Sequence, residues 1–214
     1  MSESEAVHRP RKPQADHNHV LIEYHNWLKD TRVLGSGCLT TEATDSDCRF
    51  VPKSDLQHYL KRETIVKILR VLDIRHHSAD VILKGYLKNF AILLSLDHGK
   101  LIEWFLQHDS LSDKKLPFET CPPTFPQTSD PNFFNTFSKR QWMFCAPTFS
   151  CRKHYIWALN DDCVLPIVEK EELGRGGSSV TYKIRLHPCY DRLVERSDQT
   201  KVFQRYRVVL CSIN

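Results

Sequence analysis

A proline-rich segment divides this chain into two parts, and no continuous helix or central strand can run through it. Five of them crowd the segment 117–132, at Pro117, Pro122, Pro123, Pro126 and Pro131. Proline has a fixed φ and no backbone N–H, so this density excludes a continuous helix or a central strand. We therefore predict a Pro-rich linker over 117–132, or an extended segment that wraps around its neighbours.

The part before the prolines has the hydrophobic spacing of helices. Over 54–108, apolar residues recur every three or four positions, as on one face of a helix. A less regular pattern of the same kind occupies 20–34, and the residues before it are polar and charged. We predict a disordered tail over 1–19 and a helical region over 20–116.

Local signals divide this helical region into shorter elements. Ser54 is a candidate N-cap, because its hydroxyl can accept a hydrogen bond from the first free amides of a helix. The pair Lys61–Arg62 marks a point where the pattern can split into two helices. Gly99 follows the apolar stretch 78–96, and we expect it to end that helix in the left-handed conformation.

The part after the prolines is rich in aromatic residues and then takes the spacing of strands. The segment 133–149 carries six large rings, which we expect to pack against the region that follows. Over 180–186, apolar and polar residues alternate, as in a half-buried strand, and 167–173 is a second candidate strand. The chain is therefore expected to have an α+β fold, an N-terminal helical unit followed by a small antiparallel β-sheet.

Composition narrows the class of protein. Lys and Arg number 30 against 26 for Asp and Glu, so the chain lacks the charge excess of a nucleic-acid-binding surface. The longest apolar run, Phe90 to Leu96, is too short to span a bilayer. The opening residues contain no apolar leader, and the eight cysteines contain no C-x-x-C pair. We expect a cytoplasmic or nuclear protein that is not secreted, with free thiols and with neither nucleic acid nor membrane as a partner.

A zinc site is not expected. The residues Cys145, Cys151, His154 and Cys163 have the spacing C-x5-C-x2-H-x8-C, which matches no common structural zinc pattern. Scattered free thiols are the simpler interpretation of the three cysteines.

One glycine-rich segment is a candidate ligand-binding site. The run Gly174-Arg175-Gly176-Gly177 stands between the two candidate strands. A strand, a glycine turn and a second strand are the context of a kinase phosphate loop, whereas a dinucleotide fold or a P-loop has a helix after the glycines. Glycine allows the backbone to approach phosphates closely, and backbone amides can then point at the phosphate oxygens.

The run from Glu172 to Arg185 resembles the first two strands of protein kinases, in which the glycine loop is commonly followed by Tyr-Lys, here Tyr182-Lys183. Four segments are similar to the leader of a fungal family of protein kinase-like proteins: 90–96, 111–118, 141–149 and 185–188. The resemblance implies a partial kinase-like N-lobe over 133–214, and ATP as the ligand if one binds, with no metal held by this chain. The implied ATP-binding residues are Leu173, Gly174, Arg175, Gly176, Gly177, Ser178, Ser179 and Thr181.

The chain departs from the kinase pattern at three positions. Ser179 stands in place of the third glycine, and Thr181 in place of the valine that follows it. Cys211 stands where the third strand should carry the lysine that pairs with the α- and β-phosphates, and a neutral thiol cannot replace that cation. Neither an H-R-D catalytic loop nor a D-F-G triplet occurs in the sequence.

We therefore expect a truncated protein kinase-like protein that has a degenerate glycine-rich loop and is inactive alone. By the resemblance, its full-length relatives would be ATP-dependent Ser/Thr protein kinases. The alternative is a non-catalytic interaction module, in which the helical region binds a protein partner. A nucleotide that stabilises the chain would favour the first hypothesis over the second.

Overall fold

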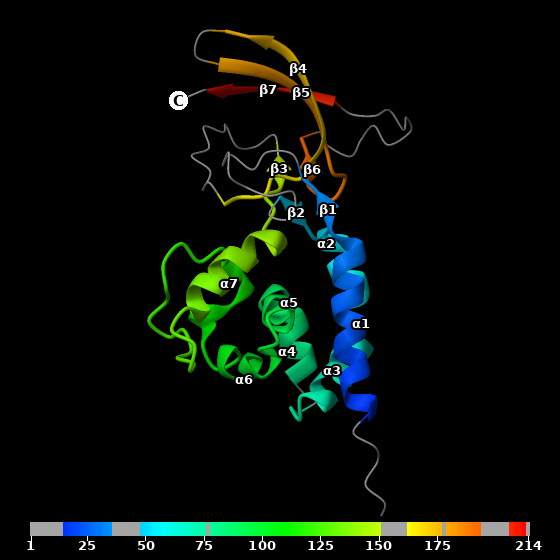
Figure 1. Ribbon diagram of the computed structural model, residues 1–214, viewed down its shortest axis with the longest axis vertical. Helices are drawn as coiled ribbons and strands as arrows, with labels where there is room; N and C mark the ends of the chain where they lie inside the picture. The colour runs from blue at the N-terminus through cyan, green and yellow to red at the C-terminus, as the bar shows by residue number, and fades with distance from the viewer. Residues whose placement is uncertain are drawn as a thin grey trace, which may run out of the picture.

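The computed structural model describes residues 15–35, 48–75, 78–150, 162–176, 179–193 and 206–212. Figure 1 shows the helices gathered at one end, a three-stranded sheet at the other, and short strands between them. The predicted α+β fold, a helical unit followed by a small antiparallel sheet, is confirmed. Among the described residues, no helix has the length and apolar character needed to cross a membrane.

Seven α-helices and four single turns of 3-10 helix are described. The helices are α1 (Ala15–Thr31), α2 (Lys53–Tyr59), α3 (Arg62–Val71), α4 (Ser78–Gly85), α5 (Leu87–Ser95), α6 (Ile102–Phe105) and α7 (Phe133–Gln141). The 3-10 turns are η1 (Gly99–Leu101), η2 (Asp109–Leu111), η3 (Asp113–Lys115) and η4 (Trp142–Phe144). The predicted split at Lys61–Arg62 is confirmed, because α2 ends at Tyr59 and α3 begins at Arg62.

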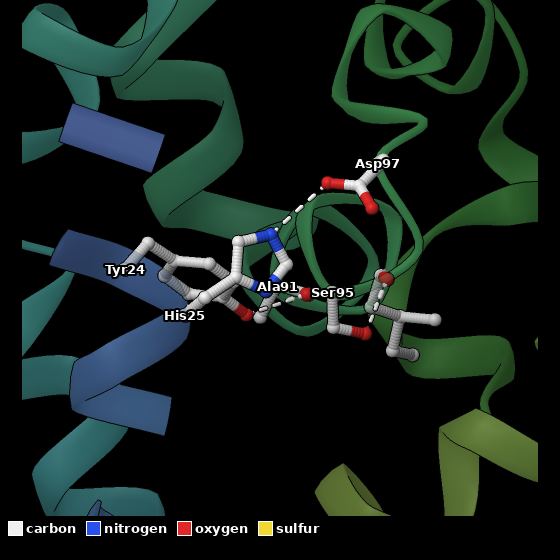
Figure 2. A network of polar contacts seen from close by, with 6 residues as sticks. Tyr24, His25, Ala91, Ser95 and Asp97 are labelled. Atoms are coloured by element: carbon white, nitrogen blue, oxygen red, sulfur yellow. Dashed lines mark hydrogen bonds and ion pairs between the residues drawn. The ribbon is translucent and has the colours of Figure 1, made fainter. Parts of the chain in front are cut away.

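Helix α5 is the centre of the helical unit. Its residues from Asn89 to Leu93 are 0% exposed, so this helix is covered on every side. A helix that is apolar all round is stable only inside a core. Two polar contacts join α1 to α5 and to the turn that ends it (Figure 2). The Tyr24 hydroxyl donates to the Ala91 carbonyl oxygen at 2.6 Å, and His25 Nε2 lies 3.0 Å from Asp97 Oδ1.

The end of α5 differs from the predicted one. Asp97, not Gly99, takes the left-handed conformation, with φ of 60°. The His98 amide donates to the Leu93 carbonyl oxygen at 2.9 Å, which is the long hydrogen bond of a Schellman motif. Gly99 is required for another reason: a Cβ there would lie 2.9 Å from Leu72 Cδ1, so the glycine allows η1 to pack closely against α3.

The start of α2 also differs from the prediction. The N-cap position is Pro52, and no side chain caps this end of the helix. The Ser54 hydroxyl donates to Asp55 Oδ1 instead and lies 2.9 Å from the Cys189 sulfur. Ser54 is therefore inside the helix, where its hydroxyl makes contact with the later part of the chain.

The Pro-rich segment 117–132 wraps the helical unit. It contains no helix or strand, yet Phe118 and Phe125 are buried in the same core as α5. The buried Gln141 side chain holds it in place, because its Oε1 accepts from the Phe118 amide at 2.7 Å and its Nε2 donates to the Phe118 carbonyl oxygen at 2.9 Å. The two backbone groups of an extended segment are thereby satisfied without a partner strand.

Four of the six rings that follow the prolines pack against the helical unit, which corrects the expectation for most of 133–149. Phe133, Phe137 and Phe144 belong to the core around α5. The wrapping segment returns the chain to α5, so α7 lies beside that helix and not beside the sheet. The end of this region packs near the strands: Trp142 and Ala146 join a second cluster, and Phe149 packs against the cluster of Ile167, Ile184 and Leu186. The packing therefore assigns 133–144 to the helical unit.

The strands form three small sheets. Strand β1 (Val33–Leu34) pairs antiparallel with β2 (Arg49–Phe50), and β3 (Phe149–Ser150) pairs parallel with β6 (Asp191–Arg192). The third sheet is antiparallel, in the order β4 (Ile167–Arg175), β5 (Ser179–Leu186) and β7 (Tyr206–Ser212). Both candidate strands flanking the glycines are confirmed.

Tyr190 joins the strands to the helical unit. Its hydroxyl donates to the Val51 carbonyl oxygen at 3.1 Å and accepts from the Lys53 amide at 3.1 Å. Its ring packs edge-on against Phe50, and the residue is 3% exposed. Burial raises the pKa of Tyr190, which keeps the hydroxyl protonated as a donor.

Candidate functional site

The glycine turn lies at the tip of the β4–β5 hairpin, at the end of the molecule away from the helices (Figure 1). Gly174 pairs with Thr181 and Arg175 with Val180. The register shifts between Glu172 and Gly174, so Leu173 is bulged out of the ladder, and it is 52% exposed. A bulge next to a turn changes the direction of the extra residue's side chain, here that of Leu173.

The hairpin brings six of the eight predicted site residues to one tip. They are Leu173, Gly174, Arg175, Gly176, Ser179 and Thr181. The other two, Gly177 and Ser178, lie outside the described residues. Leu173, Gly174 and Arg175 are contributed by the end of β4, and Ser179 and Thr181 by the start of β5.

Gly174 leaves open space above the strand. A Cβ added at this position would meet nothing within 4 Å, and its φ is outside the left-handed region. The glycine is therefore not required by packing or by backbone conformation within this chain. Its effect is to leave the backbone bare, which permits close approach of a ligand.

Arg175 does not present a free charge at this tip. Its guanidinium donates to both carboxylate oxygens of Glu172, at 3.2 and 3.1 Å. These hydrogen bonds and the carboxylate charge raise the pKa of Arg175. A phosphate at the tip would meet a neutralised pair, so backbone amides are the donors that remain.

Opposite charges face each other along the rest of the hairpin. Lys183 pairs with Glu171 at 3.2 Å, and Arg185 pairs with Glu169. The Lys170 ammonium lies 3.9 Å from the centre of the Tyr182 ring, within the range of a cation–π contact. Sequence reasoning missed this arrangement, although the acidic residues of one strand and the basic residues of the next, both at alternate positions, were a visible signal.

The buried face of the sheet supports the hairpin. Ile167, Ile184 and Leu186 form a small cluster, and Val180 is 3% exposed. Strand β7 runs beside β5, and its Cys211 pairs with Val180 close to the turn. The residue that departs most from the kinase pattern is therefore in the ladder position directly beside the candidate site.

The four residues considered for zinc do not form a described site. Cys151 and His154 lie outside the described residues. Cys145 and Cys163 belong to one apolar cluster, and burial raises the pKa of the Cys145 thiol to about 11. A neutral buried thiol is a poor metal ligand. In the part of the chain that the structure describes, no three His, Cys, Asp or Glu side chains gather as a metal site.

No protein-family model, curated protein or solved structure matches this chain. The assignment of the site therefore depends on its residues, its strand order and the geometry of the hairpin.

Proposed function

We propose that the β4–β5 hairpin is the nucleotide-contacting loop of a protein kinase-like protein. The observation that supports this best is the sheet itself, three antiparallel strands in chain order with the glycine turn between the first two. The same order follows from the kinase-like motif in the sequence. A doubly wound dinucleotide fold would instead have a helix after the glycines.

In this proposal each part of the tip has a role. The bulged Leu173 offers an exposed apolar side chain against which a nucleobase can pack. Gly174 leaves room for the phosphates to approach the backbone. The paired strands behind them, with their matched charges, hold the turn in position.

The proposed activity of this chain is binding without phosphoryl transfer. By the resemblance, Cys211 occupies the position of the phosphate-pairing lysine. Phosphoryl transfer depends almost entirely on positioning and on neutralising the phosphate charge. Of the four cations of the hairpin, Arg175, Lys183 and Arg185 are engaged with carboxylates, and Lys170 lies over the Tyr182 ring.

Thermal melting with Mg·ATP tests this proposal. A ligand that binds only the folded chain stabilises it by about 1.4 kcal/mol at ten times its Kd, which is roughly 3–6 °C for a chain of this size. We expect a saturable rise in Tm, which Gly174→Val abolishes because the new side chain occupies the approach to the backbone. Gly85→Val is the matched control, since Gly85 also has no neighbour within 4 Å of an added Cβ and lies in α4.

A cooperative melt with no change in Tm up to millimolar Mg·ATP would exclude ATP binding by this chain. The non-catalytic interaction module would then be the better hypothesis. Loss of the ATP effect in both glycine variants would show that the effect does not arise at the hairpin.

A further inference from the structure

Three arginines from distant parts of the chain meet between the helical unit and the strands. Arg32 follows the last residue of α1, Arg49 opens β2, and Arg140 is in the last turn of α7. All three are half-buried. Arginine side chains in such positions usually find carboxylate partners, because partial burial makes an unpaired charge costly.

The β1–β2 ladder brings the first two arginines together. Val33 pairs with Phe50 and Leu34 with Arg49. Continued by one residue, this register places position 32 opposite Val51. Paired residues lie on the same face of a ladder, and so do residues two positions apart in one strand. Arg32 and Arg49 therefore lie on the same face. Diagonal neighbours of this kind have Cα atoms roughly 7–8 Å apart, a distance within which two guanidinium groups can share one ligand.

A backbone hydrogen bond brings the third arginine to the same place. The Val51 amide donates to the Met143 carbonyl oxygen at 2.8 Å, and Arg140 precedes Met143 by one helical turn. The charges of Arg49 and Arg140 both act on Arg32: burial lowers its pKa, and the two neighbouring cations lower it further.

Within the part of the chain that the structure describes, no anion pairs with this cluster. Among the described residues, none of the three guanidinium groups forms an ion pair or side-chain hydrogen bond. Arg32 Nε is fully buried and has no hydrogen-bond partner in the described ranges. A buried donor without an acceptor costs free energy that a bound anion would recover.

We propose that Arg32, Arg49 and Arg140 form a binding site for a phosphate dianion, either free or as a monoester. A phosphate has the charge and the number of oxygens to engage several guanidinium forks at once, whereas a single carboxylate neutralises only one cation. This site is separate from the β4–β5 hairpin and does not depend on nucleotide binding there.

Titration of the full chain with inorganic phosphate and with phosphoserine tests the site, because neither probe carries a nucleobase. Sodium chloride keeps the ionic strength constant, and Tm and the 31P linewidth are recorded. We expect a saturable rise in Tm with both probes, and broadening of the 31P signal. Tighter binding of phosphoserine would identify a monoester as the better ligand, and tighter binding of inorganic phosphate the free ion.

Substitutions localise the effect. Arg49→Gln and Arg140→Gln are expected to weaken phosphate binding at least tenfold, and Arg49→Lys, which keeps the charge and loses the fork, by a smaller factor. Arg70→Gln, at an exposed position on α3, is the matched control and should leave the affinity unchanged. In phosphate-free buffer, Arg49→Gln should not lower Tm, because it relieves repulsion in the cluster.

Two results would overturn the proposal. One is a cooperative melt with the same Tm in phosphate and chloride, together with an unchanged 31P linewidth. The other concerns the chain's own acidic residues Glu42, Asp45 and Asp47 in the β1–β2 connection. If the wild type did not bind phosphate but a variant with Glu42→Gln, Asp45→Asn and Asp47→Asn did, the arginines would pair with these carboxylates and would not form a ligand site.

Discussion

Two aspartates end helices in a conformation that usually belongs to glycine. Asp73 after α3 and Asp97 after α5 have φ of 58° and 60°. In each case the amide two residues beyond the C-cap reaches back to the helix, and Ile74 donates to the Leu69 carbonyl oxygen at 2.8 Å. A left-handed residue with a Cβ costs about 1–2 kcal/mol, less for aspartate than for branched residues. Both positions therefore hold strain that a substitution can release.

Asp73→Gly is expected to stabilise the protein by about 0.5–1 kcal/mol, because it removes the Cβ penalty at an exposed position with no described hydrogen bond to its side chain. Chemical denaturation with a common m-value measures the change. Asp97→Gly is the comparison: it releases the same strain but loses the contact with His25, so its gain should be smaller. A larger gain at Asp97 would show that the His25 contact does not stabilise the fold.

At the scale of residues, the sequence predicted the strands around the glycine turn better than it predicted the helix ends. The glycine turn was recognised because a strand pattern on both sides leaves few alternatives for the segment between. The local pattern predicts caps at Gly99 and Ser54, because capping is the commonest local role of these residue types at such positions. In the structure, long-range contacts determine both positions, Leu72 for Gly99 and Cys189 for Ser54, and no local pattern contains that information.

The central helix α5 is capped by a residue that lies far from it in sequence. Asp113 in η3 accepts from the amides of Lys88 and Asn89, at 2.9 and 3.0 Å, which are two of the free donors in the first turn of α5. The Asn89 side chain donates to the same carboxylate at 2.8 Å. The cap therefore fixes η3 to the centre of the core as well as starting the helix.

Asp113→Ala is expected to lower the free energy of unfolding by about 1–3 kcal/mol, because it leaves these buried donors unpaired. Asp80→Ala is the matched control. It breaks the exposed pair with Arg62 and should cost no more than about 0.5 kcal/mol. Equal losses in the two variants would show that Asp113 does not act as a cap.

The same residue gives the stability a dependence on pH. Burial raises the pKa of Asp113 and outweighs the hydrogen bonds that lower it. The Asp113 carboxyl therefore binds its proton more tightly in the folded state than in the unfolded state. As a result, the free energy of unfolding falls as pH rises from the unfolded pKa of about 3.9 through the raised folded pKa. The difference in unfolding free energy between the wild type and Asp113→Ala should therefore shrink over this interval.

Helices and strands were predictable where the hydrophobic pattern was regular. The strand β5 and the short helices α2 and α3 follow directly from alternation and from three–four spacing. The packing of α7 was not predictable, because an amphipathic pattern shows that a face is buried but not against which partner. The wrapping of 117–132 was one of two alternatives, and it depends on the clamp by Gln141, which no composition rule identifies.

Tyr190 makes two of the polar contacts that join the helical unit to the strands in the described part of the chain. Tyr190→Phe is expected to lower the free energy of unfolding by about 1–3 kcal/mol, because the Val51 carbonyl and the Lys53 amide both lose their partner. Hydrogen exchange at Lys53 should become faster in this variant. Tyr182→Phe is the control, since its hydroxyl makes no described hydrogen bond, and should change stability by less than about 0.5 kcal/mol. Unchanged exchange at Lys53 would contradict the role given to Tyr190.

The central position of α5 has a consequence for synthesis on the ribosome. This helix packs against α1, which is made before it, and against α7, which is made after it; the end of α5 at Ser95 and the start of α7 at Phe133 are 38 residues apart. At about 5–20 residues per second, translation takes on the order of 2–8 seconds to cover that distance. Throughout this interval the nascent chain exposes an apolar helix that it cannot yet bury. Chaperone capture of ribosome-bound chains should therefore persist until Phe144 has emerged, and then decline.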